Sequence, residues 1–131
     1  MSFNLEVAEL VDLFSVLGDP TRLRLLNLIN GREVCVCYFV EILKQPQPKI
    51  SRHLAYMRRA GIVGARREGK WMHYSLIKPT DAAAAAILSA ALDALPSRER
   101  MQADLACLDR TCSEPERFCL ISAPMPSKAG N

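Results

Sequence analysis

The sequence predicts a mainly α-helical fold with one β-hairpin, and three observations lead to this prediction. Apolar side chains recur at helical spacing over most of the 131 residues, glycine and proline divide the chain into short segments, and two candidate strands, residues 62–66 and 71–77, flank a turn that contains glycine. Half of the residues are hydrophobic and 24% are charged, which is typical of one globular domain and excludes a disordered chain or a large two-domain enzyme.

Four short helices are predicted in the first half of the chain. The first presents one apolar face and ends at Gly18, and Asp19 with Pro20 supplies an N-cap and a first-turn proline for the second. The third is an apolar segment of about two turns. Prolines 46 and 48 separate it from the fourth, because proline cannot continue a helix interior. The predicted bounds are residues 5–17, 21–30, 34–43 and about 48–60.

A basic hairpin and two further helices are predicted after these. The strands 62–66 and 71–77 flank a turn in which Gly69 can adopt a positive φ. The second strand is expected to place Met72, Tyr74 and Leu76 on one face and Trp71, His73 and Ser75 on the other. An alanine-rich helix is expected over residues 81–95, and a last helix to about residue 108. The order α-α-α-α-β-β-α is that of a winged helix-turn-helix.

The chain is predicted to have two parts. Residues 1–95 form the winged helix-turn-helix domain for DNA binding and dimerisation, and residues 96–131 a C-terminal helical extension with a flexible, cysteine-containing tail. The start of the chain lacks the pattern of a signal peptide, and the longest apolar run, residues 82–92, is too short to span a bilayer. We therefore expect a cytoplasmic protein without a membrane partner, whose five cysteines are ligands, sensors or core residues rather than disulfides.

The charge of the chain is concentrated in one segment. The net charge is only +3, but residues 44–78 hold nine cations and one acid, a net +8. The other 96 residues hold eight cations and thirteen acids, a net −5. A basic segment within an acidic remainder favours a face that binds a polyanion.

The predicted fourth helix has two distinct faces. Its apolar residues fall at helical spacing and are expected to pack inward, whereas a second face carries hydrogen-bond donors and an aromatic ring, as a helix in the DNA major groove requires. The alternative is a solvated surface charge, with His53 simply exposed or Tyr56 turned into the core. The candidate DNA contacts are Gln47, Lys49, Ser51, Arg52, His53 and Tyr56 on this helix, and Arg66, Arg67 and Lys70 at the hairpin tip.

Four motifs in order resemble the ArsR/SmtB family of metal-responsive repressors, and within it the arsenite-responsive branch. They are DPTRLRLL at residues 19–26, EVCVC at 33–37, QPKISRHL at 47–54 and EGKWMHY at 68–74. The resemblance extends over about residues 8–95. It implies a homodimer that binds double-stranded operator DNA and leaves it when a metalloid binds. It also implies dimerisation through residues 5–17 and 81–95, in agreement with their apolar stripes.

The resemblance also implies an incomplete arsenite site. The motif of this branch resembles Cys-Val-Cys-x-x-Cys, in which Cys35 and Cys37 take the first two positions and Val40 the third. Trivalent arsenic and antimony are soft and favour three thiolates. The third is expected from Cys107 or Cys112, with Cys119 also available, or from water or a cellular thiol. Since residues i and i+2 point to different sides of a helix, binding is expected to distort the third helix and misplace the fourth.

Three alternatives compete with this interpretation. The two cysteines could be oxidised rather than ligated. A cysteine-dependent enzyme using His53 or His73 is disfavoured, because no phosphate loop or carboxylate pair accompanies them. A zinc site on the helix after the hairpin is disfavoured because it offers Asp81 and Asp93 without a histidine. No permanent cofactor is expected.

Overall fold

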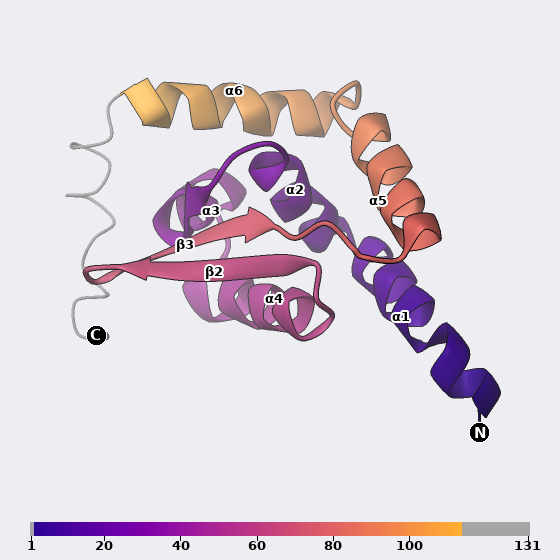
Figure 1. Ribbon diagram of the computed structural model, residues 1–131. Coiled ribbons are helices and arrows are strands. Elements are labelled where there is room, and N and C mark those ends of the chain that lie inside the picture. The colour runs from indigo at the N-terminus through magenta and orange to yellow at the C-terminus, as the bar shows by residue number, and fades with distance from the viewer. Residues whose placement is uncertain (1, 114–131) are drawn as a thin grey trace.

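The computed structural model describes residues 2–113, with side chains from residue 7 to residue 111. Figure 1 shows the hairpin crossing in front of three helices, α2, α3 and α4, while α6 runs along one edge and α1 extends away beside α5. The elements are α1 (Ser2–Leu17), α2 (Pro20–Ile29), β1 (Val34–Cys35), α3 (Val36–Leu43), α4 (Gln47–Arg59), β2 (Val63–Glu68), β3 (Trp71–Leu76), α5 (Ala82–Ala94) and α6 (Glu99–Ser113).

The winged helix-turn-helix prediction is confirmed, with one error in the third helix. Residues 34–35, predicted as its first turn, form β1 instead and pair antiparallel with β3, Val34 opposite Tyr74 and Cys35 opposite His73. The sheet order is β1-β3-β2. Without β1, the backbone groups along one edge of β3 would lack strand partners. Tertiary pairing therefore outweighs helix formation over these two residues.

Local sequence signals determine where α2 begins, where α3 ends and where α4 begins. The Asp19 carboxylate accepts a hydrogen bond of 3.0 Å from the Arg22 backbone N–H, and Pro20 follows at the first helical position, so the predicted N-cap of α2 is confirmed. Between α3 and α4, Lys44 adopts a left-handed conformation (φ 57°) and its N–H donates to the Val40 carbonyl at 3.0 Å. This tight end lets α4 begin three residues later, at Gln47.

The main apolar core draws on helices and strands throughout the described residues. Ile50, Leu54 and Met57 on α4 are all fully buried, as predicted, and burial of side chains of this size stabilises a fold by about 1.5–3 kcal/mol each. On β3, Tyr74 is buried, and Met72 and Leu76 pack against the same cluster. The hairpin, β2 and β3 with their turn (residues 63–76), is called the wing below.

The C-terminal extension packs into this core rather than standing apart from residues 1–95. Met101 and Leu108 of α6 are buried in the same cluster as Leu25 of α2. The Asp104 carboxylate, 2% exposed, receives two hydrogen bonds from the Arg24 guanidinium at 2.7 and 2.9 Å. Such a two-point pair fixes α6 on α2 in one orientation.

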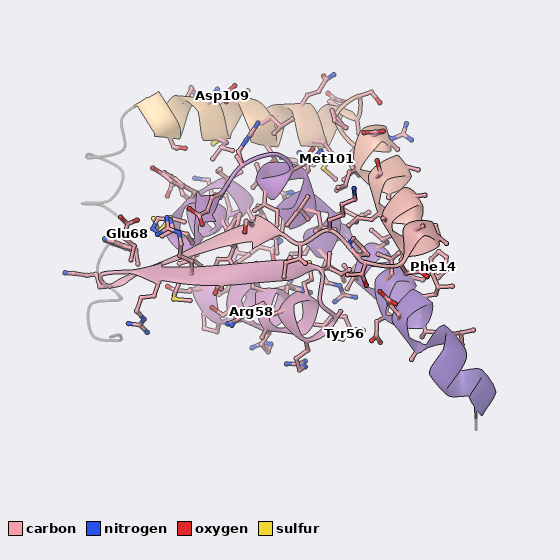
Figure 2. The ribbon with its side chains drawn as sticks, viewed as in Figure 1. Phe14, Tyr56, Arg58, Glu68, Met101 and Asp109 are labelled. Atoms are coloured by element: carbon pink, nitrogen blue, oxygen red, sulfur yellow. The ribbon has the colours of Figure 1, made fainter. Side chains whose placement is uncertain are left out.

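The outer side of α1 and the start of the segment after β3 leave apolar side chains in solvent. Val11 is 53% exposed, Phe14 54% and Ile77 43%. Figure 2 shows Phe14 on α1, facing the lower end of α5. Within the described residues, no helix combines the length and apolarity needed to cross a membrane.

Candidate DNA interface and thiol pair

Helix α4 turns its basic face to solvent because its apolar face is in the core. Lys49, Arg52, Arg58 and Arg59 are exposed, and the helix contains no acidic residue that would neutralise them. Gln47 and Ser51 are exposed at its first two turns. Cations along an exposed helix, with short polar side chains near its N-terminus, suit contacts to phosphates and base edges. Arg58 and Arg59 belong to this face, although the sequence analysis did not select them.

His53 and Tyr56, two of the predicted DNA contacts, lie on the side of α4 that meets α2. Arg22 of α2 places one terminal nitrogen 3.3 Å from His53 Nδ1 and its guanidinium carbon 4.5 Å from the centre of the Tyr56 ring. The same guanidinium donates to the carbonyls of Ser15 at 2.7 Å and Val16 at 3.2 Å, at the end of α1. Arg22 thus joins α1, α2 and α4.

The contact with Arg22 favours the neutral form of His53. A guanidinium can only donate a hydrogen bond, so a bond to His53 Nδ1 requires this nitrogen to accept and the ring proton to be on Nε2. Nε2 lies 3.9 Å from the Asp19 carboxylate. Burial lowers the pKa of His53, and the charges of Arg22, Lys49 and Arg52 add to this against the opposing effect of Asp19. His53 and Tyr56 are therefore partly engaged within the protein, and their role in DNA contact stays a prediction.

Of the three predicted DNA contacts on the wing, Arg67 and Lys70 lie near its tip and Arg66 lies further from it. Gly69 adopts the expected positive φ (64°) in the turn beside Lys70, and Arg67 and Lys70 are exposed there. The expectation that Arg66 lies at the tip is wrong. Arg66 is opposite His73 in the sheet and donates two hydrogen bonds to the Glu33 carboxylate, at 2.6 and 2.9 Å. Arg66 in turn lowers the pKa of Glu33.

Cys35 and Cys37, called the thiol pair below, meet where β1 becomes α3. Their sulfur atoms are 3.3 Å apart, and the two residues are 6% and 4% exposed. The Cys37 thiol donates to Cys35 Sγ and lowers the pKa of Cys35 to about 7, aided by backbone N–H groups at the start of α3 and opposed by burial. A trivalent arsenic or antimony centre binds its ligands as a pyramid, so two sulfurs with bonds of about 2.3 Å that meet near a right angle lie about 3.3 Å apart. The pair is thus spaced to hold one soft ion.

The expectation that binding by this pair distorts the third helix assumes that both cysteines are helical, and the structure differs on this point. Cys35 is in an extended conformation (φ −73°, ψ 144°) as the N-cap of α3, so only Cys37 is helical. An extended residue followed by a helical turn brings both sulfur atoms to the same side without unwinding α3. Trp71 of β3 packs against the pair, and His73 lies opposite Cys35 in the sheet with its Nε2 3.4 Å from the Glu68 carboxylate.

No third ligand accompanies the pair in the part of the chain that the structure describes. No group of three or more His, Cys, Asp or Glu side chains is placed to hold a metal ion among these residues. Cys107 is half-buried on α6 and packs against the main core. Cys112 is in the last turn of α6, but its side chain is outside the described part, and Cys119 lies beyond the described residues. Asp81, named for a zinc site, caps α5 by accepting from the Ala84 N–H at 2.9 Å.

Sequence reasoning assigned no role to three residues that organise these sites. Arg22 reaches His53 across 31 positions and Glu33 reaches Arg66 across 33, while Trp71 covers the thiol pair from another strand. Helical or strand periodicity cannot identify partners at such separations. The only signal in the sequence is that Arg22, Glu33 and Trp71 lie within the motifs at residues 19–26, 33–37 and 68–74.

A helix-turn-helix with an exposed basic second helix, followed by a hairpin with basic residues at its tip, defines a winged helix-turn-helix DNA-binding protein. HlyU from Vibrio cholerae N16961 shares this fold, with a TM-score of 0.56 and 27% identity over 65% of this chain and 89% of that chain. Residues 19–64 match the family described as bacterial regulatory protein, arsR family. The chain belongs to this ArsR family and is a transcriptional repressor of that family.

Relatives in the family include regulators of arsenic resistance. The chain is 42% identical over 105 residues to the arsenical resistance operon repressor of Escherichia coli K12, over 79% of this chain and 88% of that protein. It is 50% identical over 64 residues to the arsenic resistance transcriptional regulator ArsR1 of Pseudomonas putida, over 48% of this chain and 50% of that protein. These matches confirm the predicted family and the prediction of a regulator rather than an enzyme.

Proposed function

We propose that this repressor controls an arsenic-resistance operon and leaves its operator when trivalent arsenic or antimony binds Cys35 and Cys37. The observation that carries the proposal is the buried thiol pair, with its sulfur atoms 3.3 Å apart beside the DNA-binding elements. The names of the relatives in Escherichia coli and Pseudomonas putida support arsenic as the inducer.

The chemistry of the pair suits a soft ion. Thiolates select trivalent arsenic and antimony over hard cations, and a ligating cysteine must first lose its proton. Because the pKa of Cys35 is about 7, a large fraction of this residue is already thiolate near neutral pH. Cys107, Cys112 or Cys119, from either subunit, supplies the third thiolate in this proposal, or else water or a cellular thiol completes the set.

The operator is contacted by a homodimer in this proposal. Exposed Val11, Phe14 and Ile77 leave an apolar surface around α1, which a second copy would cover through residues 5–17 and 81–95. A two-fold dimer places two α4 helices roughly 34 Å apart, in successive major grooves of a pseudo-palindromic site. Exposed Lys49, Ser51, Arg52 and Gln47 of α4 then face the bases and phosphates, with Arg67 and Lys70 of the wing on the adjacent backbone.

The test measures operator binding by fluorescence anisotropy, on a duplex selected by the protein from random-sequence DNA. Arsenite, antimonite and methylarsenite are titrated into the preformed complex. Wild type releases the DNA, whereas Cys35→Ser and Cys37→Ser bind it and stay bound. Cys107→Ser, Cys112→Ser and Cys119→Ser show which third thiol is needed. Normal release from Cys35→Ser or Cys37→Ser would show that the ligand assignment is wrong.

The same sulfur separation favours a second candidate function, in which the pair is oxidised. Two thiols in contact, one with a pKa of about 7, are susceptible to sulfenic acid and disulfide formation. Release by peroxide alone, without release by arsenite, would support this redox repressor. Release by arsenite that survives an excess of reductant would exclude it.

A further inference from the structure

The face of the sheet that points away from the core carries a continuous row of polar and thiol side chains. Cys35 of β1 is opposite His73 of β3, and His73 is opposite Arg66 of β2. Paired residues of neighbouring strands project from the same face, so these three side chains form a line across the sheet. Trp71 and Glu68, which are opposite each other, lie on the same face nearer the wing tip. Figure 2 shows Glu68 at this end of the wing, remote from α5.

Contacts along this row join the thiol pair to the wing in two ways. Trp71 packs against Cys35 and Cys37 and comes directly after the turn that holds Lys70. Glu33, two residues before Cys35, accepts two hydrogen bonds from Arg66. Glu68 continues the row, because its carboxylate is 3.4 Å from both Arg66 and His73. Side-chain contacts as well as the backbone ladder therefore join β1 to β2 and β3.

The surroundings of the pair determine which element yields when a ligand enters. The pair is almost completely buried, so an ion that binds it with a third donor has to displace groups that pack against the two cysteines. On one side α3 is held by Phe39, Ile42 and Leu43, all in the core. On the other side β1 is only two residues long, and Trp71 is partly exposed. β1 and the Trp71 indole are therefore less constrained by packing than α3.

We propose that the thiol pair controls the wing: a trivalent arsenic centre bound by Cys35 and Cys37 displaces Trp71 and β1 and shifts the wing relative to α4. This inference rests on the proposed function and supplies its route to DNA. Arg67 and Lys70 at the wing tip then no longer reach the phosphates that α4 places beside them. The route differs from the one predicted from the sequence, which ran through α3 and the Pro46–Pro48 turn into α4.

The test separates ligand binding from DNA release. Its probe is phenylarsine oxide, in a chain whose Cys107, Cys112 and Cys119 are replaced by serine. The trivalent arsenic of the probe forms one bond to each sulfur of the pair, and its oxygen leaves as water with the two thiol protons. Loss of titratable thiols measures closure of the pair. The ratio of operator Kd with and without the probe measures coupling, which for linked sites is typically about 5–150-fold.

Three variants test the route. Glu33→Gln weakens the link between β1 and Arg66, and Trp71→Ala removes the indole that the ligand displaces. Glu41→Gln is the matched control, because it makes the same chemical change in the exposed Glu41–Lys44 pair of α3, at 3.4 Å. In Glu33→Gln and Trp71→Ala, we expect the thiol pair to bind the probe as in wild type, but the logarithm of the coupling ratio to fall by at least half. In Glu41→Gln, we expect the wild-type coupling ratio. Full coupling in both Glu33→Gln and Trp71→Ala would overturn the inference and leave the proposed function intact.

A second measurement distinguishes failure of the inference from failure of the proposed function. Hydrogen exchange of the wing amides at residues 66–72 is followed as the probe closes the pair. Faster exchange there supports the control of the wing, even if wild type does not release DNA and the proposed function fails. Unchanged exchange in the wing, with the pair closed, overturns the inference whatever the DNA measurement shows.

Discussion

Replacement of Arg22 by methionine should weaken both the fold and operator binding, because one guanidinium joins three helices. It donates to two carbonyls at the end of α1, contacts His53 Nδ1 at 3.3 Å and covers the Tyr56 ring at 4.5 Å. Methionine keeps much of the apolar stem of the side chain, so the substitution removes the polar contacts with little loss of packing.

The size of the effect follows from the individual contacts. A hydrogen bond to a protein carbonyl contributes about 0.5–1.5 kcal/mol net, and a partly exposed cation–π contact about 0.5–1 kcal/mol. Ser15 is only partly buried, so water can replace the guanidinium at its carbonyl. Two carbonyl bonds, the His53 contact and the stacking sum to about 2–5.5 kcal/mol of unfolding free energy, and the exposure of Ser15 places the expected loss in the lower part of this range.

The assay is urea unfolding followed by circular dichroism, at one protein concentration because dimerisation contributes to apparent stability. Operator affinity is measured in parallel. Arg22→Lys should recover part of the loss, since an ammonium keeps the charge but cannot reach both carbonyls and stack on the ring. Arg32→Met, at an exposed arginine in the loop after α2, is the control. If Arg22→Met stays within about 0.5 kcal/mol of wild type and binds the operator equally well, Arg22 does not position α4.

Three further predictions concern the DNA-binding face, the extension and the pH response. Arg52→Ala should weaken operator binding. A loss of affinity that depends on one base position, in a panel of variant operators, indicates a base contact. A uniform loss of affinity, with the slope of log affinity against log salt concentration reduced by about 0.9, indicates a phosphate contact. Asp104→Ala should lower the unfolding free energy by about 3–5 kcal/mol in urea titrations, because Arg24 stays largely buried without its partner. Adding Arg24→Met should restore part of the lost stability. Equal stability of Asp104→Ala and wild type would show that this pair does not anchor α6. The pKa of His53 is lower in the folded chain, so the unfolded chain takes up more protons as the pH falls. The unfolding free energy should therefore decrease below about pH 6.5, the ordinary pKa of histidine, and it should decrease less steeply in His53→Gln. Parallel pH profiles of the two proteins would contradict this prediction.

Much of the fold could be predicted because its signals are local. Asp19 and Pro20 mark the start of α2 through cap chemistry that depends on neighbouring residues alone. The inner face of α4 could be predicted because Ile50, Leu54 and Met57 recur at helical spacing, and all three are buried. Gly69 marks the hairpin turn because a positive φ suits glycine.

The errors arise where distant segments compete with local preference. Residues 34–35 begin the apolar segment predicted to form the third helix. They instead pair with the edge of β3 as a short strand. The hairpin sequence places Arg66 at the wing tip, but its pairing with His73 and its hydrogen bonds to Glu33 place it short of the tip, while its role in DNA contact stays a prediction. Neither partner is visible in the sequence, because the contacts join segments that only folding brings together.

The sequence by itself determined the family, the order of the helices and the wing, the basic face of α4, and Cys35 and Cys37 as the candidate ligands. These properties depend on residue type and on spacing within one segment. Only the tertiary structure decided that the two thiols already lie 3.3 Å apart, that Arg22 joins three helices, and that Trp71 and Arg66 link the thiol pair to the wing. Those properties depend on strand register and helix packing, because both bring side chains from separate segments within contact distance.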